Sequence, residues 1–323
     1  MKYRRRVDIF YYIVQQMWVS VIPLLIVALA GLYAERSGII NIALEGIMLM
    51  GALAGITFIH LFNHAMPPQL LLIVSMIIAG VVGLLFSAFH AFASINMKAD
   101  QTISGTALNI FAPAFCIFFG RLIIGTQQIT FENLFRFDKI PLLGDIPFIG
   151  DLLFKNSYLS TYIGLAILVI TYIVMYKTKF GLRLRACGDM PHAADSAGIN
   201  VYKMRWAGTL ISGFLAGMGG LVFIIPTSSI FNGNVSGFGF LALAVLIFGQ
   251  WHPSKIFFAA VFFGFMRTFS AIYADIPFIK DIAIPAAFYK MIPYIATLIV
   301  LAFTSKNSAA PRAEGEPFDK GKR

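Results

Sequence analysis

The chain has 323 residues, of which 59% are hydrophobic and only 12% are charged. Soluble domains carry about a quarter charged residues, so this composition excludes a water-soluble globular protein and indicates a surface that largely faces lipid. The formal net charge of +10 does not indicate nucleic-acid binding, because the lysines and arginines cluster beside apolar segments, as the positive-inside rule describes. Two cysteines provide no disulfide framework.

Eight apolar runs approach or exceed the roughly 20 residues that a helix needs to cross the hydrocarbon layer. They occupy residues 10–33, 39–62, 70–93, 103–124, 158–176, 206–226, 256–273 and 284–303. A shorter run, residues 240–251, follows two glycines. Barrel strands are about half as long as these runs and alternate in polarity. We therefore predict an all-α fold, a polytopic transmembrane helical bundle of about nine helices.

The polar parts of the chain suggest one membrane domain with a tail. We assign residues 1–304 to a transmembrane domain and residues 305–323 to a disordered cytoplasmic tail, because the tail mixes both charge signs with proline and glycine. The connection at residues 125–157 is long for a simple loop, and we expect it to form a cap on the external side.

The side of the membrane on which the chain begins is ambiguous. Five apolar runs precede a polar segment at residues 181–205, so a cytoplasmic polar segment places the N-terminus outside. The basic residues Lys2 to Arg6 favour the inside instead. Either this short basic stretch is a tolerated exception, or the run at residues 39–62 is re-entrant and does not cross.

A break before an apolar run appears twice, at Ser37-Gly38 and at Ser236-Gly237. Paired interrupted helices in the two halves of a transporter often border a central pathway, because their free ends present polar backbone to a cavity. Two glycine pairs with GxxxG spacing, at Gly51 and Gly213, predict close helix packing and nothing further.

Several residues near these breaks are candidates for the translocation pathway. Asn41 and Glu45 are four residues apart and share a helix face. A charge at mid-bilayer costs about 2.5–3.5 kcal/mol on insertion scales, so Glu45 should face protein or water. It either lines a cavity or makes a hydrogen bond that fixes the fold beside the pathway, or it is an interfacial glutamate in a helix-entry turn with Glu35 and Arg36 as neighbours. Asn109, a single amide within an apolar run, either makes a hydrogen bond between helices or has a role in the pathway.

Aromatic residues near the second break could stack on a planar substrate, since every base has a π-face. Phe238 and Phe240 are the candidates for the pathway. Because the chain has 32 phenylalanines, packing or lipid contact is the alternative for both.

The chain lacks sequence motifs for catalysis or nucleotide binding. It contains no GxxxxGK[ST], HExxH or GxSxG sequence, so we assign no catalytic residue, no metal site and no cofactor. His60 and His64 are four residues apart but have no third ligand nearby. If ATP drives this protein, another polypeptide must supply the ATPase site.

Residues 32–55, LYAERSGIINIALEGIMLMGALAG, resemble the signature of permease subunits of bacterial ABC importers in the branched-chain amino acid, ribose and nucleoside group. Residues 186–220, 237–253 and 291–303 resemble further blocks of the family, in the same order. Within the group, the chain is most similar to the nucleoside branch that is served by basic-membrane-protein-type lipoproteins.

This resemblance implies a fold of two inverted half-repeats with short broken helices. It also implies a second homologous permease subunit, cytoplasmic ABC ATPase subunits and an external substrate-binding lipoprotein as partners, in a lipid bilayer and without nucleic acid. By position, the residues that would dock the ATPase are Gly188, Asp189, Ala193, Ala194, Gly198 and Ile199.

Two positions depart from the pattern of that family. Asp189-Met190 stands where relatives commonly have Glu-Asn, which leaves docking credible. Phe238 stands where a polar or basic residue is common, which weakens any transfer of substrate preference.

We therefore expect a multi-pass permease subunit of the bacterial inner membrane that imports nucleosides, or a sugar or another small polar solute. The alternatives are a secondary transporter that runs on an ion gradient with Glu45 as carrier, and, more remotely, an intramembrane enzyme.

Overall fold

The computed structural model describes residues 2–139, 150–272 and 309–321, together with residues 144, 146, 288, 291, 292, 295, 296 and 298. The predicted run at residues 284–303 lies largely outside the described residues. All statements below concern the described part of the chain.

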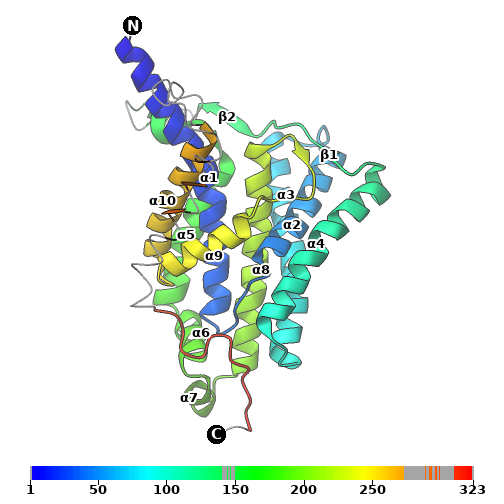
Figure 1. Ribbon diagram of the computed structural model, residues 1–323, viewed down its shortest axis with the longest axis vertical. Helices are drawn as coiled ribbons and strands as arrows, with labels where there is room; N and C mark the ends of the chain where they lie inside the picture. Colours follow the sequence, from blue (N-terminus) through cyan, green and yellow to red (C-terminus); the bar gives the residue numbers. More distant parts are fainter. Residues whose placement is uncertain are drawn as a thin grey trace.

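The first half of the chain forms four long helices and a set of short elements at one end of the bundle (Figure 1). The helical elements are α1 (Lys2–Glu35), α2 (Leu44–Phe62), α3 (Pro68–Ala91), the π-helical turn η1 (Phe92–Asn96) and α4 (Gln101–Ile124). The short elements that follow are β1 (Ile129–Thr130), β2 (Arg136–Lys139), η3 (Gly150–Phe154) and β3 (Lys155–Tyr158).

The second half repeats the alternation of long helices and short connections. Its elements are α5 (Leu159–Lys177), α6 (Lys179–Asp189), α7 (Pro191–Ser196), α8 (Val201–Thr227), β4 (Ile230–Phe231), α9 (Phe238–Phe248) and α10 (Pro253–Ile272). Strands β1 and β4 pair antiparallel, as do β2 and β3.

Seven helices in the described residues are long and apolar enough to cross a membrane. They correspond to seven of the eight long apolar runs, which confirms the polytopic all-α bundle. The short run after the second glycine break forms α9, whose 11 residues fall short of a full crossing. Interrupting the chain at Gly237 therefore yields a helix that begins inside the bundle.

Helix α8 lies at the centre of the bundle and packs against α1, α2 and α3. Its small residues allow backbone to approach backbone. An added Cβ at Gly217 would overlap the carbonyl oxygen of Ala79 in α3, and one at Gly220 would overlap that of Met48 in α2. The GxxxG pairs thus mark packing positions, as predicted.

The outer helices differ from α8 in their exposure. Helix α4 presents a row of large apolar side chains away from the bundle: Ile103, Ile110, Phe111, Phe118 and Leu122. In water such a surface would be unfavourable, whereas lipid or another apolar helix can cover it.

Different elements form the two ends of the bundle (Figure 1). The short strands and the start of α1 lie at one end, and α6 and α7 lie at the other. Helices α1, α3, α4 and α5 run from one end to the other, whereas α2 begins inside the bundle after the first break and ends beside the short strands (Figure 1). The first helix therefore begins opposite α7. This arrangement agrees with the odd number of crossings and shows that α2 is not re-entrant.

Residues 309–321, which we name the C-terminal segment, differ from the disordered tail expected there. Phe318 and Ala313 are buried, and the segment hydrogen-bonds to the bundle at Gly38 and Gly188. The mixed charge and the prolines and glycines of the tail suggested disorder, but a few buried contacts are sufficient to order such a segment against the bundle.

A prediction follows from the packing of α8. In Gly220→Ala the new methyl group has no space against the Met48 carbonyl, so we expect a loss of about 1–3 kcal/mol of stability from overpacking. The measurement is the thermal unfolding midpoint of the detergent-purified protein. Ala166→Val, which enlarges an exposed position of α5, should leave that midpoint nearly unchanged, and an equal shift in both variants would contradict the packing argument.

Candidate functional site

The polar segment (residues 181–205) folds into most of α6, all of α7 and the first turn of α8. Capping side chains fix the starts of α6 and α8. Thr178 caps α6 and Asn200 caps α8, its side-chain oxygen accepting from the backbone N–H of Lys203 at 3.0 Å. Helix α7 begins at Pro191 and ends before Gly198, whose φ of +80° is a conformation that glycine adopts without strain. The result is a short helix held across the end of the bundle.

The six predicted docking residues divide between two faces of this segment. Three are exposed: Asp189, Ala193 and Gly198. The other three contact the bundle to different extents, Gly188 and Ala194 being buried and Ile199 partly buried. Only the first three present a free surface, and their small size leaves room for a partner to approach α7 closely.

Gly188 has a packing role that sequence reasoning did not foresee. A Cβ at this position would lie 2.5 Å from the carbonyl oxygen of Arg36, in the turn that follows α1. The guanidinium of Arg36 donates to the carbonyl oxygen of Trp251, at 2.9 Å from Nη2. Gly188 therefore allows α6 to lie directly on the turn that joins α1 to the α9–α10 connection.

The polar residues of the first break hold helix ends together inside the bundle. The carboxylate of Glu45 accepts hydrogen bonds from the backbone N–H groups of Gly237 and Gly239, at 2.8 and 2.6 Å. These groups lie at the free N-terminus of α9, where a negative charge is favourable. The starts of α2 and α9 are thus joined by one side chain.

The two asparagines make similar connections. Asn109 in α4 accepts from the backbone N–H of Gly46 at 2.7 Å and donates to the carbonyl oxygen of Ile42 at 2.8 Å. Asn41 is fully buried and donates to the hydroxyl of Ser212 in α8 at 2.9 Å. These bonds are those that the fold-fixing interpretation requires; a pathway role for these two asparagines and Glu45 stays a prediction.

A cavity of about 520 Å³ opens at the end of the bundle opposite α7. Its volume falls in the range of small-molecule sites, about 300–1,000 Å³. Its polar lining combines amides, hydroxyls and a guanidinium: Gln16, Ser20, Asn232, Asn234, Arg267 and Thr268. An aromatic pair, Phe223 and Phe238, forms part of the wall, with ring centroids 4.0 Å apart.

Phe238 is the predicted pathway residue that borders this cavity. The guanidinium of Arg267 lies 5.1 Å from the centre of its ring, a distance at which a cation is attracted to an aromatic face. Phe240 is instead half-exposed on the outside of α9, and the described lining of the cavity does not include it.

Arg267 is a cavity residue that the sequence reasoning missed. It stands within the apolar run at residues 256–273, and an ionisable residue within a membrane segment is by default a candidate functional residue. The single cation in this run was therefore a sequence indication of a functional residue, whereas the length of the run indicated only a membrane helix.

Comparison with known proteins gives the family. Residues 13–301 match the family described as branched-chain amino acid transport system / permease component. The chain belongs to this family. With its apolar helices, this makes it a multi-pass protein of the bacterial plasma membrane.

Three relatives illustrate the range of the family. The guanosine ABC transporter permease protein NupQ of Bacillus subtilis is 42% identical over 98% of this chain and 99% of its own length. The nucleoside ABC transporter permease protein NupC of Lactococcus lactis is 38% identical over 96% and 97%. The glucose ABC transporter permease protein TsgB13 of Haloferax volcanii is 27% identical over 76% and 66%. No solved structure matches the chain.

The connection between α2 and α9 generates a prediction for Glu45. In Glu45→Ala two backbone N–H groups at the start of α9 lose their acceptor, and we expect a loss of about 2–4 kcal/mol of stability. Glu45→Gln keeps one acceptor oxygen and should lose less. Thermal unfolding in detergent measures the order of the variants, with Glu132→Gln, an exposed position, as control.

The same variants address an ion-coupled mechanism. If Glu45 carried protons, Glu45→Gln would abolish uptake while leaving the unfolding midpoint close to that of the wild type. Retained uptake in Glu45→Gln is the result that the hydrogen-bonding geometry favours.

Proposed function

We propose that this chain forms the translocation pathway of an ABC importer for nucleosides, powered by ATP hydrolysis in separate subunits. The observation that carries the proposal is the similarity along nearly the whole chain to two relatives named as guanosine and nucleoside permeases. A local motif could be shared by chance or by fold alone, whereas a match over 96% or more of the chain includes the helices that border the cavity.

The cavity provides groups suited to such a substrate. A nucleoside is a planar heterocycle joined to a sugar that bears hydroxyl groups. Amide and hydroxyl side chains such as Asn234 and Ser20 can pair with these hydroxyls, and Arg267 can donate to a carbonyl oxygen of the base. The wall formed by Phe223 and Phe238 keeps the remaining surface apolar. Few polar contacts in an apolar wall are typical of small-molecule sites.

The exposed face of α7 is suited to contact an ATPase. Ala193 and Gly198 leave it without bulky side chains, and Asp189 provides a charge at its edge. Since the sequence lacks a phosphate-binding loop, the ATPase must be a different polypeptide. A second homologous permease subunit, two such ATPases and an external binding lipoprotein complete the transporter in this proposal.

The proposed mechanism depends on α8. This helix begins at the polar segment and ends at the cavity, where Phe223 and Thr227 contribute to the lining. Closure of the ATPases would displace α7, and α8 would transmit the displacement because its backbone packs directly on α2 and α3. The transporter would then alternate between two packings that expose the cavity to opposite sides.

A charged, bulky residue on the exposed face of α7 tests the docking role. We expect Ala193→Arg to abolish nucleoside uptake and the co-purification of the ATPase, while the permease stays in the membrane. Gln128→Arg is the matched control and should behave like the wild type, because Gln128 is exposed and directly precedes β1, which lies at the opposite end of the bundle (Figure 1). ATP-dependent uptake by Ala193→Arg at the wild-type rate would contradict this role.

The role of the cavity is tested by Arg267→Gln. Losing a charged donor costs about 1.5–3 kcal/mol, so we expect uptake of labelled guanosine at a subsaturating concentration to fall by about tenfold or more. Glu132→Gln, which changes one exposed charge near the same end, should transport normally.

Competition by unlabelled nucleosides and by glucose in the same assay distinguishes the substrate classes. Inhibition by glucose alone would replace the nucleoside proposal with the sugar alternative. Uptake that resists a protonophore while ATP is maintained excludes ion coupling.

A further inference from the structure

The C-terminal segment (residues 309–321) lies across the same end of the bundle as the polar segment (Figure 1). Its backbone makes three hydrogen bonds to separate parts of that end. Ala309 N–H donates to the Gln250 side chain at 2.9 Å, Ala313 N–H to the carbonyl oxygen of Gly188 at 2.9 Å, and Gly315 N–H to that of Gly38 at 3.1 Å. The segment thus joins the connection after α9, the end of α6 and the turn after α1.

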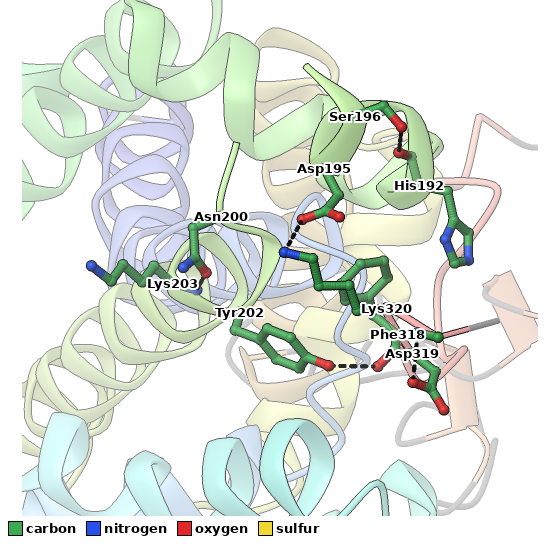
Figure 2. A network of polar contacts seen from close by, with 10 residues as sticks. His192, Asp195, Ser196, Asn200, Tyr202, Lys203, Phe318, Asp319 and Lys320 are labelled. Carbon is green, nitrogen blue, oxygen red and sulfur yellow. Dashed lines mark hydrogen bonds and ion pairs between the residues drawn. The ribbon is translucent and has the colours of Figure 1, made fainter. Parts of the chain in front are cut away.

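Phe318 lies between the segment and α7. Its ring is buried and forms one apolar cluster with Cys187, Ala194 and Val201. Figure 2 shows this ring beside His192 and Tyr202, with ring centroids 5.1 and 5.3 Å away. A helix of six residues cannot form an apolar core by itself, so the buried face of α7 depends on Phe318.

Two partly exposed ion pairs extend the contact beyond Phe318. Lys320 pairs with Asp195 of α7 at 3.5 Å, as Figure 2 shows, and Asp319 pairs with Lys98, in the turn before α4, at 2.9 Å. Exposed pairs of this kind contribute about 0–1 kcal/mol each. They therefore add little to the attachment, whereas the buried ring of Phe318 contributes apolar contact.

Arg205 fixes the middle of the segment. Its guanidinium is buried at the start of α8, and Nη1 donates to the carbonyl oxygen of Glu316 at 2.8 Å. The hydroxyl of Tyr202 donates to the carbonyl oxygen of Phe318 at 3.3 Å. Detaching the segment would remove an acceptor from a buried cation, which is unfavourable.

We propose that the C-terminal segment supports α7 from its buried side, through a contact of Phe318 that we call the seat of α7. The segment would then form part of the unit through which an ATPase moves the bundle. The inference depends on the docking role proposed above for the exposed face of α7. The ATPase would press on that exposed face, and Phe318 would support the opposite face. The backbone bonds at Gly38 and Gly188 would then carry the displacement to α1 and α6 as well as to α8.

The thiol of Cys187 can report on the seat in the permease alone. It is fully covered in the same cluster as Phe318, and burial raises its pKa to about 11, so it should react slowly with a maleimide at neutral pH. With Cys116→Ala as the background, Cys187 is the single remaining thiol.

The experiment compares three variants in this background. Phe318→Ala should speed maleimide labelling of Cys187 by about tenfold or more, because exposure lowers the thiol pKa and opens access. It should also reduce ATPase co-purification and nucleoside uptake. Phe318→Leu keeps most of the apolar volume and should restore both. Arg312→Ala, an exposed position of the same segment, is the control and should match the background.

The outcomes separate the seat from the proposed function. Unchanged labelling in Phe318→Ala overturns the seat. Faster labelling with undiminished uptake and co-purification shows that the seat exists but overturns its role in transmission. If the background chain with its partners transports no nucleoside, the proposed function fails, while the labelling and co-purification still decide whether Phe318 supports α7.

Discussion

The close packing of α8 is the constraint on which the other features depend. Gly217 faces backbone atoms of α3 and Gly220 faces backbone atoms of α2, so at these positions no side chain separates α8 from its neighbours. Contacts of this kind give membrane helices their affinity, since lipid supplies no hydrophobic driving force between them. Such a helix moves as a body with its neighbours. Helix α8 begins at the polar segment and ends at the cavity. A small displacement of the polar segment can therefore be transmitted along α8 to the cavity.

The polar groups inside the bundle gather at the helix breaks. An interrupted helix leaves backbone N–H and C=O groups without partners, and in a membrane these must be satisfied by protein. Glu45 satisfies the start of α9, and Asn109 satisfies the break before α2. These side chains thus take the place of hydrogen-bond partners in the missing turns of helix, and the cavity lies farther along, where α8 ends.

The sequence predicted the fold better than the site. The seven long apolar runs were sufficient for the helices, because hydropathy and length are local properties. The two glycine breaks were also visible. The partner of Glu45 was not, since its hydrogen bonds to Gly237 and Gly239 span more than 190 residues. Likewise, nothing in the composition of the C-terminal segment indicates that Phe318 is covered by α7. Of the cavity residues, Phe238 was suggested by its place after a break, whereas Arg267 could have been found only by asking why an apolar run contains a cation.

The two-residue pairing of β1 with β4 affects how the outer opening can change. Ile230 borders the cavity and is paired with Thr130, whose carbonyl oxygen is hydrogen-bonded to His60 Nδ1 near the end of α2, at 2.7 Å. The edge of the cavity at Ile230 is therefore connected by hydrogen bonds to α2, which carries Glu45 at its other end. A wider cavity opening would therefore displace the end of α2, so that the opening and the helix break before α2 could not change independently.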